Sequence, residues 1–361
     1  MKIVLCIPSL RTAGAEKFVA DLAVNLKRMG QEVYVALTRE NKIGQYGNEL
    51  KENKVKIVDL SGSSFFEMLR KQKAFLKKEK PDVIHANIGS MLHIMLASKI
   101  AKVPTRIYTV HNDAQLLFLG SKKRKFMYKV AFGLMKFQPV AICDTVKKSM
   151  VREFGARFEN MQQVNNGVDI EKFHPSAQNR EDESIRFVNT GTMYWIKNQI
   201  EILEVFSELV VKYPNIRLTI LGDGEDRSKL ESFIKEKDLQ NVISMPGICA
   251  DVDNYLRNSD VYISASITEG LPISMLEAMS SGLPIITSDA GGSVDLVKTG
   301  KNGIVYTRQY KDQLKAAMEE MILNPEKRKQ YGMESRKIAE DWSLEKCAKG
   351  YLNLYRQIVE R

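Results

Sequence analysis

The sequence predicts an α/β protein with two Rossmann-like domains that face each other across a cleft. A chain of 361 residues exceeds what one typical hydrophobic core holds, which favours two domains. Short apolar runs with strand character alternate with amphipathic helical stretches along the chain. Parallel sheets covered by helices on both faces produce this rhythm, and they bind ligands at the carboxyl ends of their strands.

The elements follow in order. Apolar runs predict strands at residues 3–7, 32–37, 56–59, 82–86, 106–110, 140–143 and 162–164, and then at 185–189, 217–221, 242–245, 261–264 and 284–288. Helical periodicity predicts helices at residues 15–29, 65–78, 90–100, 122–136, from 145, 197–211, 225–236, 251–257, 273–281 and 344–359. A charged stretch with a proline, residues 174–183, is the expected linker. We therefore expect domains at 1–173 and 184–343.

Composition indicates an ordinary globular protein, with 44% hydrophobic and 27% charged residues. The four cysteines lie far apart without metal or redox spacing, which favours a reducing cytoplasm. No apolar run approaches the roughly 20 residues that span a bilayer. The apolar opening leads into a glycine and a helix, so we expect a first strand there and not a signal peptide.

Charge is distributed unevenly. Residues 1–170 hold 29 Lys and Arg against 15 Asp and Glu, a net charge of +14, whereas the whole chain has +10. Such a field attracts polyanions: nucleic acid, anionic lipid or phosphorylated substrates. A nucleic-acid protein is one alternative, but interleaved aromatic residues, a recognition-helix signature and a zinc pattern are missing. We expect no nucleic-acid partner.

The most informative segment is Thr-Glu-Gly-Leu-Pro-Ile-Ser-Met-Leu-Glu-Ala-Met, residues 268–279. Glu269 stands in a Gly-Pro loop, and Glu277 stands eight positions later in a helix that opens near Ile273. A loop that ends on a helix N-terminus favours anions such as a diphosphate, and a carboxylate in that helix can accept hydrogen bonds from ribose hydroxyls. Two solvated glutamates are the alternative reading.

This segment resembles the Glu-x7-Glu motif of retaining glycosyltransferases of family 4, which have the GT-B fold. The resemblance covers nearly the whole chain through Gly14-Ala15-Glu16, Asn166-Gly167-Val168-Asp169 with Phe173, Gly191 with Lys197-Asn198, Leu221-Gly222-Asp223-Gly224, Pro246-Gly247 and Gly291-Gly292. It implies transfer of a hexosyl group from a UDP- or GDP-sugar to an acceptor hydroxyl. It also implies that residues 344–361 form a helix packing back on the N-terminal domain.

The resemblance assigns roles to particular residues. Lys197 would clamp the phosphates, Glu277 would bind the ribose, and Glu269 would face the donor sugar as a nucleophile or as an electrostatic stabiliser. His111, at a strand end, would lie near that sugar. The full expected site has His111 and Glu269 as catalytic residues and, as donor-binding residues, Gly14, Gly191, Lys197, Asn198, Gly222, Gly270, Leu271, Pro272, Ser274 and Glu277.

Two positions qualify this expectation. The family usually has an arginine immediately after Gly191, but here Thr192 follows, and a hydroxyl cannot replace a phosphate-gripping guanidinium. Three explanations stay open: Lys197 alone suffices to bind the phosphates, another base such as Arg11 contributes, or donor binding is weak. A non-catalytic protein is therefore an alternative. Asp251 and Asp253 spell an Asp-x-Asp sequence, but they stand at a helix start where Asp favours capping. We expect no obligatory metal and no other cofactor.

We therefore expect a cytoplasmic glycosyltransferase of surface-polysaccharide or glycolipid synthesis, acting on a glycan or lipid-linked acceptor. A nucleotide-sugar epimerase on the same scaffold is the enzymatic alternative. The stretch Lys122–Lys136 combines Lys122, Lys123, Arg124 and Lys125 with Val130, Phe132, Leu134 and Phe137. A basic amphipathic helix of this kind can bind an anionic membrane surface, although its apolar face can equally pack on the sheet.

Overall fold

The computed structural model describes residues 1–11, 14–44, 46–89, 91–176 and 183–360. The chain forms two compact units, residues 1–167 with 344–361 and residues 168–343. Residues 168–173, expected with the N-terminal domain, thus group with the second unit. The expected linker falls largely on residues 177–182, outside the described residues.

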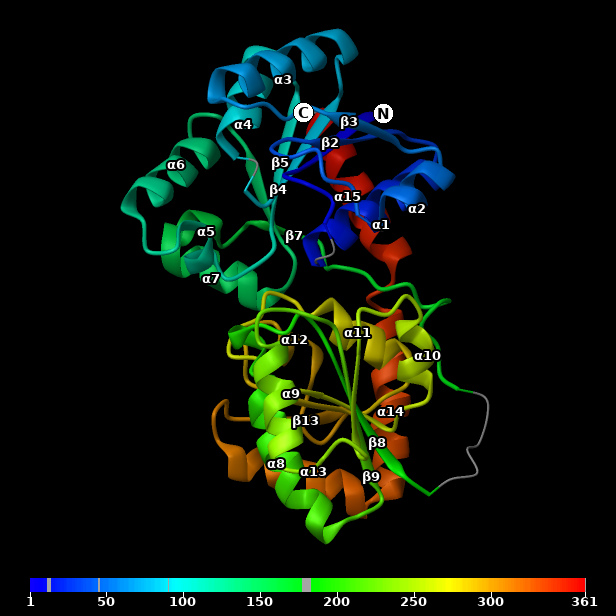
Figure 1. The fold of residues 1–361 in the computed structure, drawn as a ribbon. Coiled ribbons are helices and arrows are strands. Elements are labelled where there is room, and N and C mark those ends of the chain that lie inside the picture. Colours follow the sequence, from blue (N-terminus) through cyan, green and yellow to red (C-terminus); the bar gives the residue numbers. More distant parts are fainter. Residues whose placement is uncertain (12–13, 45, 90, 177–182, 361) are drawn as a thin grey trace. The chain divides into compact units, whose positions relative to one another are not determined.

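Unit 1 is built on a parallel seven-stranded sheet in the order β3-β2-β1-β4-β5-β6-β7. Figure 1 shows strands and helices of this unit in blue to green, with α15 in red among them. Its strands are β1 (Lys2–Ile7), β2 (Glu32–Leu37), β3 (Lys56–Asp59), β4 (Val83–Asn87), β5 (Thr105–Val110), β6 (Gln138–Ala141) and β7 (Gln162–Gln163). Its α-helices are α1 (Gly14–Arg28), α2 (Tyr46–Glu52), α3 (Phe65–Glu79), α4 (Met91–Ile100), α5 (Ala114–Phe118), α6 (Lys122–Phe132), α7 (Asp144–Phe154) and α15 (Leu344–Val359).

Helix α15 belongs to unit 1 although it ends the chain. It packs on α1, and its buried residues recur at helical spacing: Cys347, Ala348, Tyr351, Leu352, Leu354 and Tyr355. The Tyr355 hydroxyl lies 2.6 Å from Nδ1 of His85 on β4, and the Tyr351 hydroxyl lies 2.8 Å from Oγ1 of Thr109 on β5. The expected return of the last helix to the N-terminal domain is therefore confirmed.

Unit 2 repeats the scheme with a parallel six-stranded sheet in the order β10-β9-β8-β11-β12-β13. Its strands are β8 (Ile185–Thr190), β9 (Ile216–Leu221), β10 (Ile243–Gly247), β11 (Val261–Ser264), β12 (Ile285–Ser288) and β13 (Gly303–Tyr306). Its α-helices are α8 (Gln199–Lys212), α9 (Arg227–Glu236), α10 (Val252–Arg257), α11 (Ile273–Ser280), α12 (Ser293–Leu296), α13 (Lys311–Leu323) and α14 (Pro325–Glu340). The predicted class, two parallel-sheet α/β domains, is confirmed.

Helix α6 is shorter than the expected 122–136. It ends at Phe132 with Gly133, a poor helix former, as its C-cap residue, and Lys136 then adopts a left-handed φ of +55°. Of the apolar residues expected on a membrane face, Phe137 is buried and Phe132 packs among the rings of Tyr108, Tyr128 and Phe154. That part of the predicted membrane face instead belongs to the core of unit 1.

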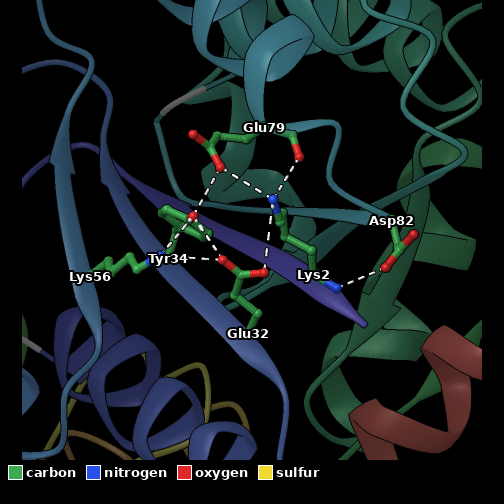
Figure 2. A network of polar contacts seen from close by, with 6 residues as sticks. All are labelled: Lys2, Glu32, Tyr34, Lys56, Glu79 and Asp82. Carbon is green, nitrogen blue, oxygen red and sulfur yellow. Dashed lines mark hydrogen bonds and ion pairs between the residues drawn. The ribbon is translucent and has the colours of Figure 1, made fainter.

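A network of polar and charged side chains lies at the amino-terminal ends of the strands in the unit 1 sheet (Figure 2). Its members are Lys2, Glu32, Tyr34, Lys56, Glu79 and Asp82. The Tyr34 hydroxyl lies 2.9 Å from a carboxylate oxygen of Glu32 and 2.9 Å from one of Glu79, so it can donate its one hydrogen to either. The Lys2 ammonium lies 3.2 Å from Glu79. Hydrogen bonds from Tyr34 and Lys2 lower the pKa of the Glu79 carboxyl. Because parallel sheets bind ligands at the other edge, we interpret this network as structural.

No helix in the described parts of the chain is long and apolar enough to cross a membrane.

Candidate functional site

The central feature of unit 2 is an ion pair where the strand order reverses. Strand β8 connects to β9 on one side, while β11 lies on its other side. Lys197 follows β8 and Glu269 follows β11, and the Lys197 Nζ lies 2.5 Å from the Glu269 Oε1. Crevices at such reversal points are where open α/β sheets bind ligands. Lys197 and Glu269, expected in one site from the sequence, therefore lie side by side.

Glu269 has a second partner that the sequence did not indicate. The Ser266 hydroxyl donates to the same Oε1 atom at 2.6 Å, and Ser266 itself is buried. The carboxylate side chain is only 10% exposed. A lysine and a serine thus fix the orientation of this carboxylate. In the sequence, Ser266 could have been singled out only by its position just after β11.

The N-terminus of α11 completes this side of the site. Gly270 and Leu271 lead into Pro272, which is the N-cap residue of the helix. The first-turn amides of a helix have no intrahelical acceptor and attract anions. The Ser274 hydroxyl lies 3.0 Å from the hydroxyl of Tyr262 on β11. This contact joins the first turn of α11 to the sheet. Burial, and to a lesser extent the nearby carboxylates, raises the pKa of Tyr262 to about 12.

Glu277 lies in α11 and is 9% exposed. The charges of Glu269 and Glu277 both add to the raised pKa of Tyr262, after burial. A partly accessible carboxylate beside a helix N-terminus can accept hydrogen bonds from paired hydroxyls while the helix binds phosphate. Lys197, Ser266 and Glu269 form one hydrogen-bonded cluster, and Glu277 lies in the helix that follows it.

Glycines allow the loops of this cluster to approach one another. A Cβ at Gly291, whose φ is +49°, would lie 1.9 Å from the Glu269 carbonyl oxygen. A Cβ at Gly222 would lie 2.0 Å from the Gly191 carbonyl oxygen, so Gly222 brings the ends of β8 and β9 together. Gly191 itself lies against the methylene chain of Lys197. The structure gives these glycines a positioning role for the residues that carry charge.

Asn198 also acts within unit 2. It turns the chain into α8 with a left-handed φ of +51°, and its amide donates to the Glu201 Oε2 at 2.6 Å. The buried Glu201 accepts a second hydrogen bond from Tyr306. The sequence marked Asn198 as donor-binding, and the structure shows that its side chain holds the segment that carries Lys197.

Thr192 replaces the usual arginine with an exposed, uncharged side chain. The other base considered for this role, Arg11, belongs to unit 1, where its guanidinium lies 2.5 Å from the Glu40 carboxylate. Within unit 2, two cations contact the Glu269 loop: Lys197 pairs with the Glu269 carboxylate, and Arg308 donates to the Ile267 carbonyl oxygen at 2.9 Å.

Two expected residues lie in unit 1. Gly14 opens α1 after β1, at the reversal point between β1 and β4. His111 follows β5 and is 8% exposed, with its Nε2 2.8 Å from the Oδ1 of Asn87 and its ring against Phe18. Burial lowers the pKa of His111 to about 3, so the imidazole is neutral at physiological pH. Asn87, the last residue of β4, was not singled out from the sequence.

The Asp-x-Asp sequence is not arranged for capping as expected. Asp251 occupies the N-cap position of α10 without a side-chain capping bond, and Asp253 lies 2.8 Å from Arg257. Among the described residues, no group of three or more His, Cys, Asp or Glu side chains could hold a metal ion.

Two family models match consecutive parts of the chain. "Glycosyltransferase Family 4" matches residues 12–172, and "Glycosyl transferases group 1" matches residues 170–338. A relative from Escherichia coli, UDP-Gal:alpha-D-GlcNAc-diphosphoundecaprenol alpha-1,3-galactosyltransferase, is 31% identical over 64% of this chain and 63% of its own length. The putative glycosyltransferase EpsD from Bacillus subtilis is 23% identical over 92% and 91% of the two chains.

Solved structures share the fold over the whole chain. Anabaena HepE, solved in complex with UDP, has a TM-score of 0.85 with 19% identity over 99% of this chain and 100% of its own. A glycosyltransferase from Rickettsia africae has a TM-score of 0.83 with 18% identity over 100% and 99%. The solved structures show that the chain shares their GT-B fold. The two family models together match residues 12–338, so the chain belongs to the family 4 glycosyltransferases.

Proposed function

We propose that this protein is a retaining glycosyltransferase that moves a hexosyl group from a UDP- or GDP-sugar to an acceptor hydroxyl. The observation that carries the proposal is the Lys197–Glu269 pair at the strand reversal of unit 2, beside the N-terminus of α11. A cation and a helix N-terminus together suit a diphosphate, and the adjacent carboxylates suit a sugar and a ribose.

Each residue then has a defined task. Lys197 stabilises the negative charge that develops on the departing diphosphate, and Glu277 accepts hydrogen bonds from the ribose hydroxyls. Glu269 either attacks the anomeric carbon or stabilises positive charge on the sugar. His111, neutral in the folded protein, positions donor or acceptor hydroxyls and does not supply a proton. Gly14 leaves room for substrate at the start of α1.

Ligand binding and turnover test the donor site. Thermal shifts against UDP- and GDP-sugars identify the donor, because a ligand at 100 times its Kd stabilises by about 2.7 kcal/mol. Lys197→Ala and Glu277→Ala should each weaken donor binding by about 2 kcal/mol or more. Lys301→Ala and Glu236→Ala, at exposed positions of the same unit, are the matched controls. Wild-type affinity in both site variants would refute the site.

Product analysis separates the alternatives. A transferase releases nucleoside diphosphate only when acceptor is present, whereas an epimerase returns an intact nucleotide sugar. Retention predicts that the product keeps the donor's anomeric configuration, which NMR of the product determines. A protein that binds donor but forms neither product with any acceptor would be a non-catalytic binder. Turnover should persist in a strong chelator, and a complete, magnesium-reversible loss would point back to Asp251 and Asp253.

The acceptor is proposed to be a glycan or a lipid-linked glycan. The Escherichia coli relative is named for a diphosphoundecaprenol acceptor, and the Acholeplasma laidlawii relative for monoglucosyldiacylglycerol synthesis. With such an acceptor, we propose that the protein acts on the cytoplasmic face of a membrane, in the synthesis of a surface polysaccharide or glycolipid.

The surface around α6 supports peripheral membrane binding. Three large apolar side chains are strongly exposed there, Leu119, Phe126 and Leu134 at 66–71%. The basic residues Lys122, Lys123 and Arg124 are exposed beside them, whereas Lys125 pairs with Glu153 at 2.9 Å. Exposed apolar groups among basic ones fit an anionic headgroup layer.

Vesicle sedimentation tests this surface. The protein should pellet with anionic vesicles at low salt and stay in solution at high salt. Changing Lys122, Lys123 and Arg124 to Ser, or Phe126 to Ser, should reduce pelleting, while Lys301→Ser in unit 2 should not. Wild-type protein that remains in the supernatant at low salt would exclude membrane binding and favour a soluble acceptor.

A further inference from the structure

Unit 1 contains a cavity of about 320 Å³ that the donor site does not use. It lies at the carboxyl ends of β4 and β5, under helices α4, α5 and α6. All of its lining residues belong to unit 1. Its volume is at the lower end of the range for small-molecule sites.

The interior of this cavity is apolar and its walls adapt easily. Its most buried lining residues are Met95, Tyr108, Tyr128 and Ala131. The two tyrosine hydroxyls lie 3.4 Å apart and face each other. Further methionine, leucine and isoleucine side chains line the cavity, and unbranched methionines fit irregular apolar ligands. Such walls suit a hydrocarbon chain better than a nucleobase, which needs several hydrogen-bond partners in its plane.

Two guanidinium groups line the cavity together with these apolar residues. Arg39 follows β2 and Arg124 lies on α6, and both residues are exposed. Neither guanidinium forms an ion pair with a carboxylate among the described residues, unlike Arg11 and Arg152 nearby in the same unit. Asn112 adds an exposed amide to the lining. Arginine forks bind phosphate oxygens in pairs, so the rim has the chemistry of a phosphate site.

We infer that this cavity binds the phosphate-bearing end of a lipid acceptor. The first part of the hydrocarbon chain occupies the apolar interior, and Arg39 and Arg124 bind the phosphate groups. Arg124 and Met127 line the cavity on α6, on either side of the 67% exposed Phe126, so the cavity adjoins the surface proposed to contact the membrane. The inference rests on the proposed function because it names the acceptor class.

Binding of farnesyl diphosphate to the full-length protein, below its micelle concentration and without vesicles, tests the inference by calorimetry. Wild-type protein should bind it saturably. The double variant Arg39→Ala/Arg124→Ala should lose about tenfold or more in affinity, because two charged phosphate contacts are removed. The matched control Lys123→Ala/Lys129→Ala removes two exposed charges from the same helix and should stay within about twofold.

A second variant and two partial ligands test the apolar interior. Ala131→Phe fills the cavity and should abolish binding, while an unchanged UDP-induced thermal shift verifies that the rest of the protein is intact. Farnesol and pyrophosphate should each bind far more weakly than the intact diphosphate. Equal affinity for pyrophosphate, unaltered binding in either variant, or displacement of farnesyl diphosphate by UDP would overturn the inference.

These readouts are independent of catalysis. Farnesyl diphosphate binding in a protein that transfers no sugar would contradict the proposed function and leave the lipid site standing. Sugar transfer to a soluble acceptor, without binding of farnesyl diphosphate, would support the transferase and refute the lipid site.

Discussion

The position of Glu269 depends on a residue that has no side chain. Gly291 adopts a φ of +49°, and a Cβ there would lie 1.9 Å from the carbonyl oxygen of Glu269. Real atoms cannot approach so closely, so any other residue at this position must push the Glu269 loop away. Because Glu269 pairs with Lys197 and Ser266 through one oxygen, that displacement would disturb the whole cluster.

Gly291→Ala should therefore reduce both stability and donor binding. Gly300 provides the matched control, since it also has a positive φ, +83°, but open space around its Cα. Gly300→Ala should cost about 1–2 kcal/mol for the left-handed backbone alone. Gly291→Ala should cost about 1–3 kcal/mol more, from overpacking, and should weaken UDP-sugar affinity. Urea unfolding and calorimetry measure both. Equal effects of the two variants on stability and affinity would contradict the proposed dependence.

At the residue scale, the sequence predicted which charged groups gather in unit 2 but not how they are held. The resemblance to family 4 glycosyltransferases placed Lys197 and Glu269 in one site, and in the structure both residues follow neighbouring strands and form an ion pair. Ser266 and Tyr262 were not foreseen. No sequence pattern distinguishes a serine or tyrosine that supports a site from one that merely belongs to a buried strand or its end. Asn198 was assigned to the donor, yet its amide bonds Glu201, a contact three positions away that depends on a left-handed turn.

At the element scale, α15 shows how a helix far along the chain is anchored in unit 1. Its tyrosines reach into the sheet, and the Tyr355 hydroxyl lies 2.6 Å from Nδ1 of the fully buried His85. The other ring nitrogen of His85 lies 2.6 Å from Thr109 Oγ1, which also contacts Tyr351. Both ring nitrogens of His85 therefore have hydrogen-bond partners, and α15 supplies one of them.

Tyr355→Phe should loosen this anchor without creating a cavity. A buried ring nitrogen would lose its partner, which typically costs about 1–3 kcal/mol. We expect lower stability in urea and faster amide hydrogen exchange along α15. Tyr310→Phe, at a residue that is 60% exposed, should change neither measurement. If Tyr355→Phe leaves exchange in α15 unchanged, the hydroxyl does not anchor the helix.

The length of an element did not by itself decide whether the sequence predicted it. Helix α10, of six residues, was expected, whereas α13 and α14, of 13 and 16 residues, were left unassigned. The last helix was expected at 344–359 and is observed there, because a strong apolar stripe defines it. Helices α2 and α5, of seven and five residues, are too short for a periodicity signal. Helix α6 was predicted too long because apolar residues continue past Gly133, although the helix ends at Phe132 and the backbone turns left-handed at Lys136. The elements between residues 289 and 343 were left unassigned.

At the scale of the whole molecule, the two units differ in their buried histidines. Of the four histidines, His85, His93 and His111 belong to unit 1, and the exposed His174 belongs to unit 2. Burial lowers the pKa of His85 and of His111 from 6.5 to about 3, and His111 adds to the effect on His85. Burial, together with the charge of Arg39, also lowers the pKa of His93. The folded state of unit 1 therefore resists protonation at groups that the unfolded chain protonates readily.

Unit 1 should consequently lose stability in mild acid before unit 2. The unfolded state binds protons near pH 6.5, whereas the folded state does so only near pH 3. Stability is thus complete above pH 6.5 and falls as the pH drops, by about 2 kcal/mol for each histidine at pH 5. Burial raises the pKa of Glu16, so protonation of this carboxyl stabilises the folded state as the pH falls. This one group offsets only part of the loss from the two histidines.

The two tryptophans offer a way to see this, because Trp195 and Trp342 both lie in unit 2. In thermal scans at pH 5, circular dichroism should fall before tryptophan fluorescence changes, whereas at pH 7.5 the two transitions should lie closer together. His85→Gln, which keeps hydrogen-bonding groups near Tyr355 and Thr109, should remove about half of the pH dependence between 6.5 and 5, while His174→Gln should leave it intact. Coincident transitions at pH 5, with a pH dependence that His85→Gln does not alter, would show that these imidazoles do not control the acid stability of unit 1.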